Sequence, residues 1–275
     1  METYIAVVIF IFGMIFGSFL NVILYRYNSG RSTGGRSACL SCGKHLAWHE
    51  LIPAISFFIQ KGKCRGCGSK ISIQYPLVEL GTGLLFILSY YYLGALHNFD
   101  NIWEILKFAL LLDVMCFSVL IFTYDLKHKI IPDTFSIPLA VAALILLLIS
   151  NPLSHFGTTL GILDLAAGPI LFIFFFLFWW LSKGRAMGLG DAKLALTTGW
   201  LLGAKLALSG LFLAFIIGAI VGLFFMLISR LKVITNSVTM KSEIPFAPFL
   251  ILGTLIILFS GIDITGISTI FDLGI

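Results

Sequence analysis

Long apolar runs occupy most of this chain and constrain its fold more than any other feature. Eight of them are near the length of about 20 residues that a helix needs to cross a bilayer. We predict transmembrane helices at 4–24, 77–96, 103–123, 134–150, 163–182, 193–208, 211–229 and 246–262. Only Ser209 and Gly210 divide the sixth run from the seventh. The pattern predicts an all-α polytopic membrane protein with about eight transmembrane helices.

Composition supports this fold class. Hydrophobic residues make up 59% of the chain and charged residues only 11%, whereas a soluble domain has about 25% charged residues. The net charge of +5 does not indicate nucleic acid binding, because basic residues also collect in cytoplasmic loops of membrane proteins. We expect lipid, and no nucleic acid, around the protein. The chain starts without a basic segment, so the first run is predicted to stay as a transmembrane helix and not to be a secretory signal.

Lysine and arginine are distributed unevenly between the loops, which predicts an orientation. If segment 25–76 lies in the cytoplasm, the loops on the same side are 124–133, 183–192 and 230–245. Sixteen of the 18 basic residues then fall on that side or at its helix ends, Lys107 and Lys205 being the exceptions. Cytoplasmic loops carry such an excess, so these segments are predicted to face the cytoplasm.

Segment 25–76 is also polar enough to form a separate module. It contains eight basic residues against the single acidic Glu50, together with many Gly, Ser and Cys residues. The sequence therefore predicts a first transmembrane helix at 1–24, a cytoplasmic module at 25–76 and a transmembrane core at 77–275.

Two Cys-x-x-Cys pairs in this module have the spacing of metal-binding knuckles. They are Cys39 with Cys42 and Cys64 with Cys67, separated by 21 residues. Cytosolic thiols stay reduced, and four thiolates suit a tetrahedral zinc ion with no open position for catalysis. We predict a structural zinc site, the alternatives being a redox pair or metal-free cysteines. His45 and His49 lie between the pairs and are predicted to be surface residues, because four thiols already complete the site.

Two aspartates stand at the edges of apolar runs. Asp125 ends the third run, and Asp191 follows a glycine turn at the start of the sixth. Carboxylates at a membrane edge are costly and are therefore candidates for function. A helix N-terminus favours an anion and a C-terminus disfavours it, so we expect Asp191, as an N-cap, to be the ionised partner and Asp125 the protonated one. Two close carboxylates sharing a proton form the arrangement of an aspartic protease; the alternative is that both are interfacial helix caps.

Three further charged residues are candidates for substrate contact. Asp133 follows Pro132 in the first turn of the fourth run, where a helix dipole also gives it a structural role. Glu79 lies near the start of the second run, either in a packing network or in contact with substrate or cofactor. Lys193 either stabilises the ionised Asp191 or extends to the membrane interface.

The glycines around Asp191 are further candidates. Gly188 and Gly190 would let the backbone turn, so that Asp191 heads a helix and a substrate strand passes close by.

The chain resembles the bacterial type IV prepilin peptidases, the bifunctional leader peptidase/N-methyltransferases of the Gly-x-Gly-Asp class of membrane aspartic proteases. Six segments carry the resemblance in order: Gly17–Arg26, the two cysteine pairs, Tyr75–Glu79, Asp125–Asp133, Gly188–Lys193 and Ile244–Phe249. One departure is Ala247, where the family more often has glycine.

The resemblance implies a function and a location. Family members cut the short basic leader from prepilins and pseudopilins at the cytoplasmic face of the bacterial inner membrane. Many then methylate the new amino terminus with S-adenosylmethionine. By this resemblance Asp125 and Asp191 become the catalytic pair of an aspartic peptidase core, and the four cysteines become zinc ligands. A basic leader would need acidic contacts, for which Glu50, Glu79 and Asp133 are candidates.

The methyltransferase activity has no residues assigned to it from the sequence. No Gly-x-Gly-x-x-Gly turn opens a helix after a strand, so any adenosylmethionine site would be of a non-standard kind.

Two other functions remain open at this stage. A polytopic transporter could use Asp113, Glu79 and Lys107 along a proton path. A non-enzymatic secretion-assembly factor could use the zinc module to bind its partners. The transporter alternative leaves both the thiol module and the paired aspartates unexplained.

Overall fold

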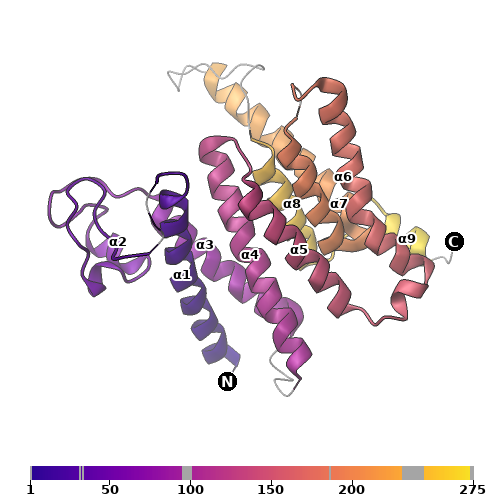
Figure 1. Ribbon diagram of the computed structural model, residues 1–275, viewed down its shortest axis with the longest axis horizontal. Coiled ribbons are helices and arrows are strands. Elements are labelled where there is room, and N and C mark those ends of the chain that lie inside the picture. Colours follow the sequence, from indigo (N-terminus) through magenta and orange to yellow (C-terminus); the bar gives the residue numbers. More distant parts are fainter. Residues whose placement is uncertain are drawn as a thin grey trace. The chain divides into compact units, whose positions relative to one another are not determined.

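The computed structural model describes residues 2–30, 32, 34–94, 101–185, 187–230 and 245–272. Over these ranges the chain is helical, with two isolated β-bridges and no β-strand. The predicted all-α fold class is therefore confirmed. The chain forms two compact units, Met1–Thr123 and Tyr124–Ile275, which are described separately (Figure 1).

The first unit contains two long apolar helices and most of a third. A module with short helices lies between the first two in the sequence. Its elements are α1 (Glu2–Arg26), η1 (Trp48–Glu50), α2 (Ile55–Ile59), α3 (Gln74–Leu93) and the larger part of α4 (Ile102–His128). Small residues bring α1 and α3 together: a Cβ atom on Gly17 would lie only 2.7 Å from the Cα atom of Glu79. Membrane helices associate through close backbone approach of this kind, because lipid tails are as apolar as the side chains and the hydrophobic effect does not drive the helices together.

The second unit begins with the last turn of α4 and is built around one long helix. Its remaining elements are α5 (Asp133–Ser150), η3 (His155–Gly157), α6 (Thr159–Ser182), α7 (Leu189–Arg230), α8 (Ala247–Ser260) and α9 (Ile267–Asp272). Helix α7 packs against α5, α6 and α8, so it forms the centre of this unit. Between α7 and α8, the hydroxyls of Thr198 and Thr254 are hydrogen-bonded at 2.9 Å.

Within the described residues, six helices are long and apolar enough to cross a membrane: α1, α3, α4, α5, α6 and α7. Helix α8 is apolar but has only 14 residues, which corresponds to about 21 Å at 1.5 Å per residue. The protein is therefore a multi-pass membrane protein. The predicted sixth and seventh spans are both part of α7.

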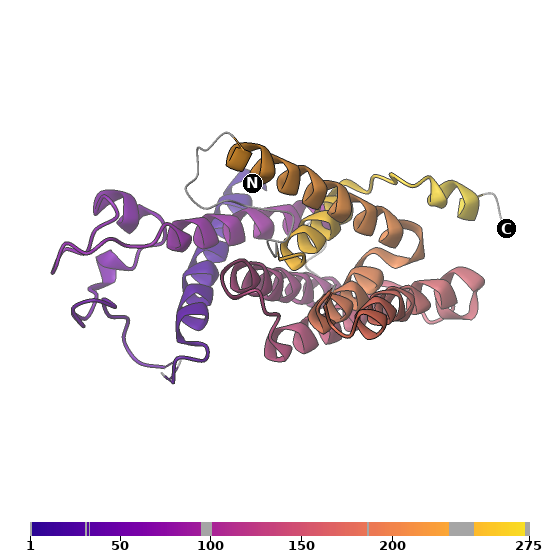
Figure 2. The same ribbon diagram turned by 90° about the horizontal axis from the view of Figure 1, so that it is seen from above.

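Helix α7 is interrupted, but not where the sequence predicted. Gly203 has φ 65° and ψ 179°, which breaks the 42-residue helix into two halves, and the ribbon changes direction partway along α7 (Figure 2). The predicted division at Ser209 and Gly210 was wrong. The Ser209 hydroxyl bonds Asp263 at 2.7 Å within an unbroken stretch of helix. Counted with α8 and with both halves of α7, the helices agree with the predicted eight segments.

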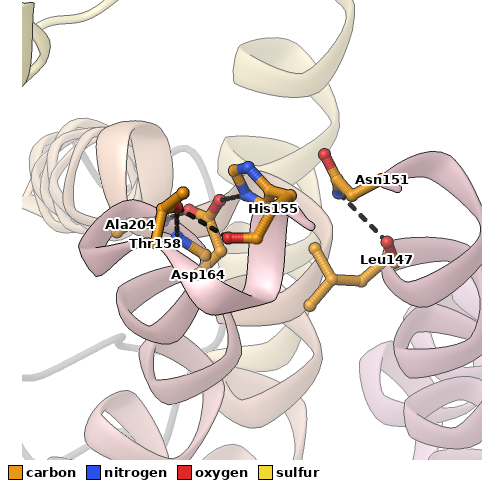
Figure 3. A network of polar contacts seen from close by, with 7 residues as sticks. Leu147, Asn151, His155, Thr158, Asp164 and Ala204 are labelled. Atoms are coloured by element: carbon orange, nitrogen blue, oxygen red, sulfur yellow. Dashed lines mark hydrogen bonds and ion pairs between the residues drawn. The ribbon is translucent and has the colours of Figure 1, made fainter. Parts of the chain in front are cut away.

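A carboxylate from another helix stabilises the break in α7. Asp164 of α6 accepts a hydrogen bond from the backbone N–H of Ala204 at 2.8 Å, and its second oxygen lies 2.9 Å from Nε2 of His155 (Figure 3). A Cβ atom on Gly203 would lie 2.8 Å from Asp164 Oδ1. Only glycine therefore accommodates both the left-handed backbone and this close contact.

Candidate active site and metal centre

Asp125 and Asp191 lie in the same unit, on different helices. Asp125 is buried in the last turn of α4, and Asp191 is half-buried in the first turn of α7. The charge of Asp125 acts on Asp191, so the two carboxylates lie within electrostatic reach of each other. Residues 66 positions apart in the sequence are thus brought to one place. An arrangement of this kind can share a proton between its members.

The loop between α4 and α5 sets the position of both aspartates. Lys129 adopts a left-handed conformation, with φ 55°, and its N–H donates to the carbonyl of Asp125 at 2.8 Å. Ile131 of this loop packs against the start of α7. A Cβ atom added to Gly190 would lie 2.8 Å from the Cβ atom of Ile131. Gly190 is therefore needed for close packing next to Asp191, in addition to any role in turning the chain.

The two carboxylates accept backbone hydrogen bonds from helix N-termini. Asp191 Oδ2 accepts from the N–H of Gly188 at 3.3 Å. Asp191 is the third residue of α7, so the expectation that it is the N-cap was wrong; it acts as half of a capping box instead. Asp125 accepts from the N–H of Ala247, the first residue of α8. Helix ends therefore do not distinguish an ionised from a protonated partner.

Asp133 and Lys193 form an ion pair with each other. Lys193 Nζ lies 2.5 Å from Asp133 Oδ1 and joins the first turn of α5 to the second turn of α7. Neither predicted role of Lys193, stabilising Asp191 or extending to the interface, anticipated this partner. The Asp133 side chain is 60% exposed, and pairs at such exposure contribute at most about 1 kcal/mol to stability. The pair therefore matters more for alignment of the two helix starts than for energy.

Glu79 is engaged within the first unit. Its side chain is buried, and Oε2 accepts from the N–H of Ala54 at 2.7 Å while Ser18 of α1 also hydrogen-bonds it. Ala54 has φ 55°, an unfavourable conformation for a residue other than glycine. Glu79 thus holds a strained turn before α2 against the membrane helices. These contacts favour the packing-network alternative for Glu79.

The four cysteines of the module converge. All four Sγ atoms lie within 4.8 Å of one another, and those of Cys39 and Cys67 are 3.9 Å apart. Sulfur atoms of a tetrahedral zinc–thiolate site, with bonds of about 2.3 Å, are separated by about 3.8 Å. The donor set and its spacing therefore fit a zinc ion. His45 and His49 are exposed and lie outside the cluster, as predicted.

The two knuckles share one backbone design. The N–H of Gly43 donates to the carbonyl of Cys39 at 2.9 Å, and the N–H of Gly68 donates to that of Cys64 at 2.8 Å. Both glycines are left-handed, with φ 71° and φ 72°. Each turn therefore closes tightly and directs its pair of thiols to the same side, which is what a shared ion requires.

Backbone donors prepare one thiol for metal binding. The N–H of Cys42, followed by that of Ser41, donates to the sulfur of Cys39 and lowers its pKa to about 6. The pKa of Cys42 is raised to about 11, although the N–H of Lys44 lowers it, because burial and the neighbouring thiols oppose a second negative charge. A cation at the centre of the cluster would remove that repulsion.

Sequence reasoning missed two partners of the aspartates. The N–H of Ala247 is a backbone group, so its residue type carries no signal, although Pro248 beside it is typical of a helix start. Ile131 was overlooked because it belongs to a short apolar loop whose packing depends on the glycine at position 190.

Comparison with known proteins gives matches along most of the chain. Residues 11–93 match the Bacterial Peptidase A24 N-terminal domain, and residues 112–223 match the Type IV leader peptidase family. A prepilin leader peptidase/N-methyltransferase of Bacillus subtilis is 32% identical over 90% of this chain and 92% of its own length. Proteins of the same name from Klebsiella pneumoniae and Myxococcus xanthus are 31% and 34% identical, over 70% and 81% of this chain.

The coverage of these relatives differs. The alignment spans 83% of the Klebsiella protein but only 63% of the Myxococcus protein, which is longer. No solved structure gives a significant match. Two adjoining domain models in the expected order, together with the near-full-length match to the Bacillus protein, show that the chain belongs to the type IV leader peptidase family.

Proposed function

We propose that this protein is a membrane aspartic endopeptidase that removes the basic leader from prepilins or pseudopilins, with Asp125 and Asp191 as its catalytic pair. The proposal is supported by the electrostatic reach of Asp125, at the end of α4, to Asp191, at the start of α7, and by the packing of Ile131 from the intervening loop on Gly190. The names of the relatives supply the substrate class.

Hydrolysis at such a pair needs one proton shared between the two carboxyl groups. The ionised carboxylate takes a proton from water, and the water oxygen bonds to the scissile carbonyl carbon while the protonated partner donates to the carbonyl oxygen. The C–N bond then breaks as the amide nitrogen takes up a proton. One water is consumed, and a leader carboxylate and a free amine are released. Two carboxyl groups that share a proton in this way titrate as a unit.

A second activity follows from the relatives' names. We propose that the chain also methylates the new amino terminus, for which S-adenosylmethionine supplies the methyl group. The chain contains no Gly-x-Gly-x-x-Gly turn that opens a helix after a strand, and no residue is assigned to this cofactor. Zinc is proposed for Cys39, Cys42, Cys64 and Cys67, where four thiolates leave no open position and so give the ion a structural role.

The proposed location is the bacterial inner membrane, with the zinc module and the active site facing the cytoplasm. The excess of Lys and Arg in four segments supports this orientation. The start of α7, the ion pair at Asp133 and the loop before α5 all belong to that basic side.

Among the acidic residues considered for the leader, Asp133 is the best candidate. Glu79 is buried against Ala54, and Glu50 is held by the N–H of Ala47 at 2.9 Å and by Lys44 at 3.4 Å. Asp133 is exposed beside Lys193, where a leader cation could exchange for the lysine. The backbone at Gly188 and Gly190 is proposed to let the cleavage segment approach Asp191.

The proposal is tested by incubating the detergent-solubilised full chain with a prepilin and measuring leader-sized mass loss. Asp125→Asn and Asp191→Asn should each abolish cleavage, whereas Glu104→Gln, which changes a carboxylate paired with Lys107 at 2.8 Å, should not. Cleavage that persists in either aspartate variant would contradict the catalytic pair.

A transporter receives no support from the contacts of Lys107. The alternative placed Asp113, Glu79 and Lys107 along a proton path, but Lys107 pairs with Glu104 and Glu79 with the N–H of Ala54. Mass loss that is absent from the wild-type protein as well would reopen the non-enzymatic alternatives.

A further inference from the structure

Apart from Ser209, which bonds Asp263, the buried hydroxyl groups in the described helices are of two kinds. Those that donate to the carbonyl four residues earlier in their own helix are Thr82, Ser89, Ser118, Thr198 and Thr254. Ser136 and Thr197 differ, because neither hydroxyl has a hydrogen-bond partner among the described residues. Two hydroxyls of the same chemistry are thus left unsatisfied in otherwise similar helices.

Both unpartnered side chains are almost completely buried. Ser136 is 1% exposed and Thr197 is 2% exposed. A buried hydroxyl without a partner loses its bond to water and gains nothing in return. Thr198, the next residue in α7, shows that this helix offers the usual carbonyl acceptor, at 3.3 Å. The hydroxyl of Thr197 does not use such an acceptor.

The two hydroxyls belong to α5 and α7, two helices that pack against each other. Ser136 follows Asp133 by three residues and Thr197 follows Lys193 by four, and residues at these spacings are neighbours along a helix surface. Asp133 and Lys193 are joined at 2.5 Å. Both hydroxyls therefore lie about one turn, or roughly 5.4 Å, further along their helices than this ion pair. Neither hydroxyl bonds to the other or to another described protein group.

A third unpartnered atom belongs to the same region. Asp125 Oδ2 is buried and also lacks a hydrogen-bond partner among the residues that the structure describes. The rings of Tyr124 and Phe135 are in contact, with centroids 6.2 Å apart. Asp125 follows Tyr124 in the chain, and Ser136 follows Phe135. The unsatisfied carboxylate and the unsatisfied hydroxyl of Ser136 thus flank the same short turn.

We propose that Ser136 and Thr197 hold ordered water beside Asp125 and that this hydration site supplies the water consumed in peptide hydrolysis. A buried water needs two to four polar partners. Each hydroxyl can donate and accept, and an ionised carboxylate oxygen accepts. Near these hydroxyls in the two helices, Leu139, Leu194 and Ala195 are buried and apolar and therefore cannot hold water. The inference rests on the proposed function, since it assigns the water used by the two aspartates.

The two adjacent threonines of α7 provide a matched test. Thr197→Val and Thr198→Val make the same change at neighbouring sites, each 2% exposed. Thr197→Val and Ser136→Ala should each lower kcat for a prepilin about tenfold or more while KM is unchanged, because substrate binding does not use the water. The melting temperature of both should stay within a few degrees of the wild-type value, because each hydroxyl is proposed to bond water and not another protein group.

The control should show the opposite pattern. Thr198→Val removes bonds to Leu194 and Thr254, so its melting temperature should fall while kcat is kept. Thr197→Ser keeps the hydroxyl and should restore most of kcat. A high-resolution structure of the wild-type protein should contain ordered water between Ser136 and Thr197, and that water should be missing in Thr197→Val.

The outcomes separate this inference from the proposed function. Wild-type kcat in both Ser136→Ala and Thr197→Val, with Asp125→Asn and Asp191→Asn inactive, overturns the hydration site and leaves the peptidase intact. A fall in melting temperature in Thr197→Val without a fall in kcat also overturns it, because the hydroxyl is then structural. Activity that persists in either aspartate variant overturns the catalytic pair instead.

Discussion

The two halves of α7 each begin beside an aspartate, but the two carboxylates are satisfied to different degrees. At the break in the helix, both oxygens of Asp164 are used, one by Ala204 at 2.8 Å and one by His155 at 2.9 Å. At the start of the helix, Asp191 accepts one bond of 3.3 Å from Gly188 and faces the like charge of Asp125.

This contrast separates a structural carboxylate from a chemical one. Asp164 meets a donor at each oxygen, so its network stabilises the fold. Asp191 and Asp125 bring two acidic groups together in a poorly hydrated place, which costs stability unless they share a proton. Proteins keep such unfavourable pairs where the chemistry needs them. Asp164 and Asp191 both lie beside the start of a helical segment, so this position does not separate a structural role from a chemical one. Whether each carboxylate oxygen has a hydrogen-bond donor separates them better.

The largest expected effect concerns the catalytic pair. Asp191→Asn should lower kcat at least about 10³-fold, because an amide cannot accept the proton of water. Its melting temperature should stay the same or rise, since the repulsion from Asp125 is removed. Prepilin cleavage and thermal unfolding of the same detergent-solubilised sample measure both quantities. A large drop in stability would place Asp191 with Asp164 as a structural residue.

Gly190→Ala should have the next largest effect on activity. The added Cβ would lie 2.8 Å from Ile131 Cβ, so the start of α7 must move. A displacement near 1 Å can cost about 100-fold in rate, and we expect a 10- to 100-fold loss of kcat. Gly81→Ala in α3, where a Cβ meets nothing within 4 Å, is the control. Equal activity of the two variants would mean that the loop gives way without moving Asp191.

Gly203→Ala should affect stability and leave the chemistry unchanged. The side chain would lie 2.8 Å from Asp164 Oδ1 at a residue with φ 65°, and such strain costs about 1–3 kcal/mol. The melting temperature should fall by several degrees, while kcat per folded molecule stays within about twofold. Gly261→Ala is a matched control, because it has the same φ of 65° with open space around it. If both variants lose the same stability, the contact with Asp164 contributes nothing.

The smallest effect concerns Asp263, which like Asp164 has a hydrogen-bond donor at each carboxylate oxygen. The Ser209 hydroxyl, together with the hydroxyl and backbone donors of the following loop, holds the pKa of Asp263 well below its usual range. Because the pKa is lower in the folded state, the stabilisation is fully present above the unfolded value of about 3.9 and is lost as pH falls further. Asp263→Asn should therefore lower the melting temperature by a few degrees at pH 7.

The difference should shrink below pH 4, where the wild-type carboxyl begins to lose the same advantage. Melting temperatures of both proteins between pH 2.5 and pH 7 would show this. A difference that stays constant with pH would mean that the asparagine is destabilising for a reason other than charge.

The sequence predicted those features that depend on local pattern. Apolar runs located α1, α3, α4, α5 and α6 to within several residues at most ends, because hydrophobic length is what a bilayer requires of a helix. The cysteine knuckles were recognisable because each is a turn of four residues whose geometry is set by its own glycine. Asp125 and Asp191 stood out because a charge at the end of an apolar run is rare.

Features that depend on distant partners were not predicted. The break at Gly203 needs Asp164, which lies 39 positions earlier on another helix. Ser209 and Gly210 looked like a better break, but Ser209 bonds Asp263 across 54 positions without leaving the helix. The pairing of Lys193 with Asp133 across 60 positions likewise has no local signal. Each requires a contact that only the folded chain provides.

The contact between Ala54 and Glu79 has a consequence for the order in which the protein is made. All four cysteines lie before α3 in the chain, so the proposed zinc site has all its ligands while that helix is still being synthesised. Its strained turn at Ala54, however, obtains its carboxylate partner only when residue 79 has been added, 25 positions later. During translation, metal capture can thus precede attachment to the membrane helices, and insertion of α3 becomes the step that fixes the module in place.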